Sequence, residues 1–204
     1  MFKASDQDRV LIAAAVKKAE SATTGQIVPM IVSQSDDYAA ARWRIGIFTG
    51  LLCGFLVNHF FPDLDALWLL STQIPAIGAG FILAQFAPLK RLFISKHELE
   101  DQTHHRAVEA FFAHGLHTTH DRTGVLIIIS VLERKVRVLA DSGINSKVPE
   151  KAWDDVIALL IAAIREKKPM DGMARAIALC GEHLASSFPG KSEVNELPDG
   201  LVTE

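Results

Sequence analysis

Residues 45–61 read IGIFTGLLCGFLVNHFF, and after a short acidic break residues 67–89 read LWLLSTQIPAIGAGFILAQFAPL. Neither run contains Asp, Glu, Lys or Arg. The hydrocarbon core of a bilayer is about 30 Å thick and needs roughly 20 apolar residues as a helix, with about 17 to 25 tolerated. The two runs therefore predict a transmembrane helical hairpin over residues 44–90. The alternative is a buried core hairpin of a soluble protein, although a core helix is rarely apolar on every side over this length.

The charges around the hairpin predict its orientation. Basic residues stand on both outer flanks, namely Arg42, Arg44, Lys90, Arg91 and Lys96. The connecting loop carries Asp63 and Asp65 and neither Lys nor Arg. Loops rich in Lys and Arg stay on the cytoplasmic side. We therefore expect a two-pass protein of a bacterial inner (plasma) membrane with both termini in the cytoplasm.

Small residues recur every fourth position in both apolar runs. The first run has Gly46, Gly50 and Gly54, and the second has Ala76, Gly80 and Ala84. Such ridges let helix backbones approach closely in lipid. Either the two ridges pack against each other, or they bind a second copy of the chain or the helix of another membrane protein.

Outside the hairpin, the pattern is helix–strand before it and helix–strand–strand–helix–helix after it. The run Gly124–Val131 is the most apolar of the soluble part, which predicts a central strand buried on both faces. Pro29 lies inside the first strand and predicts an edge position or a bulge. We expect an α/β fold, a single layered sandwich with a central mixed sheet flanked by helices, formed by residues 1–40 and 95–188. Residues 189–204 are polar and are expected to be a disordered tail.

The formal net charge is −3 and the basic residues are scattered, which argues against a nucleic-acid partner. The two cysteines, Cys53 and Cys180, are too few and too badly placed for a disulfide framework or a zinc site. The sequence has neither a Gly-rich phosphate loop nor a G-x-S-x-G motif. A nucleophilic hydrolase is not expected.

Carboxylates follow two of the predicted strands. Asp36 and Asp37 come after the first strand, and Asp141 comes after the last. If these loops meet at the carboxyl edge of the sheet, they could bind Ca²⁺ or Mg²⁺ or position a water for phosphate hydrolysis. The alternative is that they are solvated turn residues. Histidines between His97 and His120 are spaced at helical intervals, but no partner motif supports a metal site there, and a solvated helix face is the competing interpretation.

Two segments carry a family resemblance. The first is Gly124-Val-Leu-Ile-Ile-Ile-Ser-Val-Leu-Glu133-Arg134-Lys135-Val-Arg-Val138 followed by Asp141-Ser-Gly143-Ile144, and the second is Thr24-Gly25-Gln26-Ile27-Val28. They resemble the signature of the TPM domain family and its opening T-G-x-I-V strand. The resemblance extends over residues 5–40 and 95–188. It implies a compact α/β sandwich with helices on both sides of the sheet.

The resemblance implies little about activity. Family members include thylakoid-lumen proteins tied to photosystem II repair, one of which is reported to have acid phosphatase activity and to bind calcium, and others that assist receptor assembly. Members usually enter an exported compartment, and the internal hairpin departs from their pattern. We expect a non-enzymatic accessory or scaffold protein whose cytoplasmic domain aids assembly, stability or repair of a membrane complex, with no cofactor. The alternative is a metal-dependent acid phosphatase acting through the loop carboxylates.

Overall fold

The computed structural model describes residues 4–190 and 196–203 and divides the chain into two compact units. The sheet unit comprises Met1–Ser35 and Gln102–Glu204, and the hairpin unit is Asp36–Asp101. Each unit is described by itself below. Helix α5 (Lys96–Ala113) crosses the boundary between them.

The sheet unit is built on a four-stranded mixed sheet in the order β3-β2-β1-β4. The strands are β1 (Gln26–Val32), β2 (Gly124–Ser130), β3 (Lys135–Ala140) and β4 (Val202–Thr203). Strand β1 runs parallel to β2 and to β4, whereas β2 and β3 are antiparallel. Strand β1 thus lies between β2 and β4 rather than at the edge of the sheet that Pro29 predicted. In the described part of the chain β4 pairs only with Met30 and Ile31, so Pro29, which has no N–H to donate, lies beyond this short pairing.

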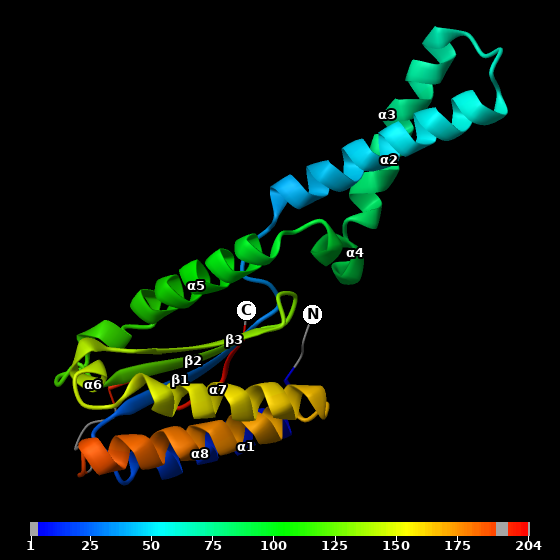
Figure 1. Ribbon diagram of the computed structural model, residues 1–204. Helices are drawn as coiled ribbons and strands as arrows, with labels where there is room; N and C mark the ends of the chain where they lie inside the picture. Colours follow the sequence, from blue (N-terminus) through cyan, green and yellow to red (C-terminus); the bar gives the residue numbers. More distant parts are fainter. Residues whose placement is uncertain (1–3, 191–195, 204) are drawn as a thin grey trace. The chain divides into compact units, whose positions relative to one another are not determined.

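Helices cover both faces of this sheet, as Figure 1 shows. Helices α1 (Asp6–Glu20), α7 (Glu150–Arg165) and α8 (Pro169–Ser187) pack on one face, against the strand residues Ile27, Ile31, Val125, Ile127 and Ile129. On the other face α5 and the short helix η1 (Leu116–Thr118) pack against Val28, Met30, Leu126 and Ile128. Every residue of β1 and β2 is buried. The predicted α/β sandwich with a central, doubly covered strand is therefore confirmed.

The tail after Pro189 differs from its predicted disorder. Its described part contains β4, and Leu201 before that strand is buried. The backbone amide of Leu197 also donates to Oε1 of Gln26 at 3.3 Å. This segment is ordered because Val202 and Thr203 pair with β1 and Leu201 is buried, which offsets the loss of conformational entropy. Residues 191–195 and 204 lie outside the described residues.

The hairpin unit contains α2 (Ala39–Phe60), α3 (Ala66–Leu83) and the short helix α4 (Ala87–Leu92). Helices α2 and α3 pack side by side (Figure 1), and α3 continues through Pro75. Both helices are long and apolar enough to cross a membrane, yet only 28% of the apolar window of α2 and 6% of that of α3 is buried. A buried core hairpin of a soluble protein, the alternative interpretation of the sequence, does not fit these values.

Candidate functional site

The inner face of the hairpin consists of small residues in close contact. A Cβ added to Gly80 would lie 2.7 Å from Cα of Gly46. One added to Gly50 would lie 2.7 Å from Cγ1 of Ile77, and one added to Gly54 would lie 2.8 Å from Nε2 of Gln73. Ala84 is fully buried and Ala76 is half-buried. Gly46 of the first ridge therefore meets Gly80 of the second, whereas Gly50 and Gly54 meet the larger side chains of Ile77 and Gln73.

The outer face of the hairpin carries large apolar side chains. Phe55 is 69% exposed on α2, and Leu67 and Ile74 are 73% and 74% exposed on α3. Other exposed members are Ile47, Phe48, Leu51, Leu52, Leu56, Trp68, Leu70 and Ile82. Soluble monomers rarely expose apolar patches larger than a few hundred Å². An arrangement with small residues inside and large apolar residues outside is typical of helices packed in lipid.

The two ends of the hairpin differ in charge. At the end where the turn lies, Asp65 caps α3 by accepting a hydrogen bond from the amide of Leu67 at 2.8 Å. At the other end, Nη1 of Arg44 donates to the carbonyl of Phe93 at 2.9 Å and pairs with Oε2 of Glu98 at 3.1 Å. Arg44 therefore ties the beginning of α2 to the end of α4 and the beginning of α5.

The loop carboxylates proposed as a metal site do not follow the same edge of the sheet. Val32, at the end of β1, pairs with Ser130 at the end of β2. Because β3 is antiparallel to β2, Asp141 lies at the opposite end, where its amide donates to the carbonyl of Gly124 at 2.9 Å. The segment that leads from Val32 to Asp36 and Asp37 therefore begins at the opposite end of β2 from Asp141.

Each of these carboxylates has a local structural role. Oδ2 of Asp36 accepts from the amide of Tyr38 at 2.8 Å. Buried Asp141 caps the short helix α6 (Ser142–Asn145) and pairs with Nε of Arg122 at 2.9 Å. Residues 4–190 and 196–203 contain no group of three His, Cys, Asp or Glu side chains that could hold a metal ion. Assignment of Ca²⁺ or Mg²⁺ to Asp36, Asp37 and Asp141 stays a prediction from the sequence.

The histidines between His97 and His120 lie mostly on the surface. His97 forms an ion-pair contact with Asp101 one turn later, and the imidazole of His97 is 85% exposed. His120 contacts Asp121 at 3.0 Å and is likewise exposed. These contacts are typical of solvated residues.

The sequence did not predict a polar cluster that lies where β1 and β2 end. Glu133 is fully buried, and its carboxylate accepts a hydrogen bond from Oγ of Ser130. Its second oxygen accepts from the backbone amide of Ser35 at 2.8 Å, and the hydroxyls of Ser35 and Ser130 lie 2.8 Å apart. The sequence suggested only that Glu133 belongs to a turn. The one available signal was a Glu directly after an otherwise continuous apolar strand.

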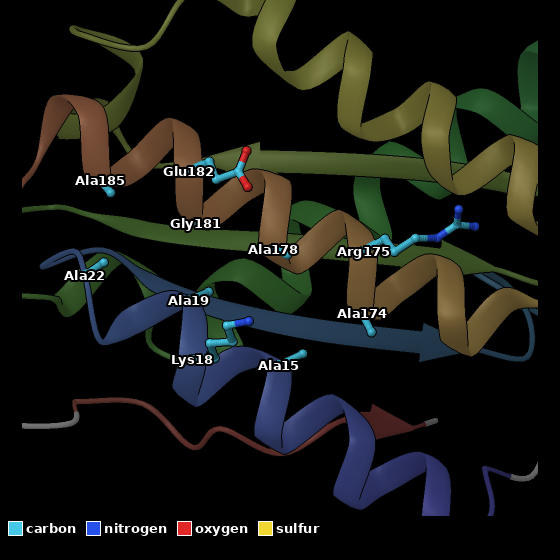
Figure 2. Close-up of a pocket in the computed structure, with 10 residues that line it drawn as sticks. All are labelled: Ala15, Lys18, Ala19, Ala22, Ala174, Arg175, Ala178, Gly181, Glu182 and Ala185. Atoms are coloured by element: carbon cyan, nitrogen blue, oxygen red, sulfur yellow. The ribbon is translucent and has the colours of Figure 1, made fainter.

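The sheet unit also has a groove between α1 and α8, shown in Figure 2, with a volume of about 430 Å³. Alanines from both helices line most of it, and Lys18, Arg175 and Glu182 supply its charges. The helices cross closely here, because a Cβ on Gly181 would lie 2.7 Å from Cβ of Ala19. Short side chains at the crossing leave the groove open on the outer surface.

Comparison with known proteins agrees with the fold and with the resemblance in the sequence. The model of the TPM domain matches residues 92–182. This match supports the resemblance to the TPM domain family over that segment of the chain. The matched segment contains both Glu133 and Asp141, whereas α2, α3 and the α1 wall of the groove lie outside it.

A solved structure shares the fold of this chain. The NMR structure of the BA42 protein from the psychrophilic bacterium Bizionia argentinensis has a TM-score of 0.61 and 18% sequence identity, and the alignment covers 98% of this chain and 94% of that one. At this identity the similarity shows the fold alone. No curated protein matches the chain.

Proposed function

We propose that this TPM domain protein is a membrane-anchored accessory or scaffold protein that aids assembly, stability or repair of a membrane complex. The observation that supports it is the inverted hairpin, in which Gly46, Gly50 and Gly80 are buried while residues such as Phe55 and Ile74 are exposed. Burying such side chains in lipid removes about 25 cal/mol of unfavourable free energy per Å² of apolar surface. The hydrocarbon core of a bilayer would bury these exposed apolar side chains.

The proposal places the hairpin across a bacterial inner membrane with both termini in the cytoplasm. Its support is the charge asymmetry, with Arg42, Arg44, Lys90 and Arg91 at one end of the hairpin and Asp63 and Asp65 at the other. Residues 33–38 alone connect β1 to α2, and Ser35 in this connection is held by Glu133.

Crosslinking in native membranes, mild-detergent extraction and mass spectrometry of the captured proteins test the accessory role. We expect a membrane protein to be captured with the wild type and with the control Gly78→Leu, since Gly78 lies on the outer face. Gly80→Leu should lose the partner, because it separates the two helices. Capture that is identical for both variants, or absent from the wild type, contradicts the role.

Topology is tested separately with single-cysteine variants and an impermeant thiol reagent. Replacing Cys53 with Ala and adding Ser5→Cys or Asp63→Cys gives one reporter for the N-terminal region and one for the turn. Cys180 is buried and stays unreactive in the folded protein. In intact spheroplasts we expect labelling at position 63 alone. Labelling at position 5 alone would overturn the orientation.

The alternative activity is metal-dependent phosphate hydrolysis through Asp36, Asp37 and Asp141. The opposite placement of Asp141 and Val32 along β2 gives it no support. Hydrolysis of a generic phosphomonoester by the purified full chain with Ca²⁺ or Mg²⁺, abolished by Asp36→Asn, would favour it over the accessory role.

A further inference from the structure

The end of the hairpin opposite its turn combines basic and apolar side chains. Arg42 and Arg44 belong to the first turns of α2, and Lys90 and Arg91 belong to the last turn of α4. The Phe48 and Phe93 rings, 5.7 Å apart between centroids, bring the end of α4 against α2. The hydrogen bond from Arg44 to the Phe93 carbonyl fastens the same junction. Two basic pairs that are far apart in sequence therefore share one end of the hairpin, which we call the basic base.

Exposed apolar side chains surround the basic base. Trp43 is 58% exposed, Phe86 is 61% exposed and Leu92 is 78% exposed. Trp43 is held in place by an edge-to-face contact with Phe81, with centroids 4.8 Å apart. Indole rings prefer the level of the lipid headgroups, and short helices with basic and apolar faces lie in that region. The side chains around the basic base therefore match a headgroup layer rather than water or hydrocarbon.

The nearby carboxylates are engaged within the protein. Glu98 pairs with Arg44, and Asp36 accepts from the amide of Tyr38. From Ile45 to Leu89 the chain has two charged residues, Asp63 and Asp65, and both belong to the turn at the far end. All the Lys and Arg side chains of the hairpin therefore lie at the end that carries the basic base, whereas the only charged side chains of the turn are acidic.

We propose that the basic base binds the phosphate groups of anionic phospholipids, with Arg42 and Arg91 as the principal donors and Arg44 positioning them. Guanidinium groups bind phosphate oxygens in a bidentate geometry, and a membrane surface of negative potential attracts each added cation. This inference rests on the proposed membrane anchoring and goes beyond it by naming the lipid class and the residues that select it.

Quenching of tryptophan fluorescence by brominated lipids tests the inference on the full chain in vesicles. One variant keeps only Trp43 through Trp68→Phe and Trp153→Phe, and the matched control keeps only Trp68 through Trp43→Phe and Trp153→Phe. We expect brominated phosphatidylglycerol to associate near Trp43 about threefold more strongly than brominated phosphatidylcholine. At Trp68, beside the acidic turn, the two lipids should quench equally.

Two further measurements separate the possible outcomes. The double substitution Arg42→Gln with Arg91→Gln should abolish the preference for phosphatidylglycerol at Trp43. In the variant that keeps both arginines, raising the salt concentration to about 0.5 M should reduce this preference. Equal quenching by both lipids at Trp43 would overturn the headgroup inference while leaving the anchor in place. Absence of quenching by either lipid at both tryptophans would overturn the membrane anchor and the inference together.

Discussion

The backbone amide of Ser35 donates a hydrogen bond of 2.8 Å to the buried carboxylate of Glu133, 98 residues later in the chain. Ser35 is the last residue of the first segment of the sheet unit, and Glu133 lies in the turn between β2 and β3. The contact lies where the chain leaves the domain for the hairpin, and it is reinforced by Ser130. The buried carboxylate of Glu133 thus fixes the exit of β1, since it accepts hydrogen bonds from both the half-buried Ser35 and the buried Ser130.

Replacing Glu133 with Ala should destabilise the protein by about 1–3 kcal/mol, because the buried hydroxyl of Ser130 and the half-buried amide of Ser35 lose their acceptor. Urea unfolding of the full chain in mild detergent, followed by the fluorescence of Trp153, measures the change. Glu166→Ala is the control, since this exposed side chain ends α7 and should change stability by less than about 0.5 kcal/mol. Equal effects of the two substitutions would show that the buried contact contributes nothing.

Gly80→Leu should destabilise the packing of α2 against α3, because a Cβ at this position already lies 2.7 Å from backbone Cα of Gly46. Overpacking of this kind costs about 1–3 kcal/mol. Gly78→Leu is the matched control on the same helix, since within the described residues nothing lies within 4 Å of its added Cβ. Thermal unfolding in detergent should show a lower Tm for Gly80→Leu alone. A comparable loss of Tm in both variants would mean that helix propensity, rather than the packing of α2 against α3, determines the change in stability.

Stability should fall as pH rises from about 4.5 to about 7. Burial raises the pKa of Glu20 from 4.5 to about 7, opposed by the hydrogen bond from the amide of Ile27 and assisted by the charge of Asp199. In this interval the folded protein binds more protons than the unfolded chain, so each increase in pH favours unfolding, and the effect ends above pH 7.

Glu20→Gln should flatten this part of the pH profile, because the amide of the new side chain does not titrate while its oxygen can still accept from Ile27. Denaturant midpoints measured between pH 4.5 and 8 provide the test, with Glu182→Gln on the exposed surface of α8 as the control. If the denaturant midpoint of Glu20→Gln still fell between pH 4.5 and 7, the pH dependence would belong to other titratable groups.

Gly143→Ala should disturb the end of β2 at which Asp141 lies. Its Cβ would stand 2.5 Å from the carbonyl oxygen of Asp121 and 2.6 Å from that of Arg122, both of them backbone atoms. Arg122 already has a positive φ of 56°, so this segment has little freedom to move away. We expect a loss of about 1–3 kcal/mol by chemical unfolding. Gly200→Ala, which meets no atom within 4 Å among the described residues, should be neutral.

The hairpin and the central strands followed from the sequence, because each depends on local composition. Ile45–Leu89 has only two charged residues, both in the turn, and Gly124–Val131 is apolar at nearly every position. A long uncharged helix and an uninterrupted apolar strand have few environments in which they are stable. Run length and residue type therefore determined the fold class and the number of apolar helices.

Tertiary structure alone decided the contacts between distant segments. The direction of β3 placed Asp141 at the end of β2 away from Val32, and the open edge of β1 ordered Leu201 and β4. Packing of the two helices brought Gly46 of the first ridge against Gly80 of the second. No partner of Glu133 was evident from the sequence, and only the fold brought Ser35 to it. A sequence records which groups need burial or a hydrogen-bond partner, but only the folded chain determines which partner is within reach.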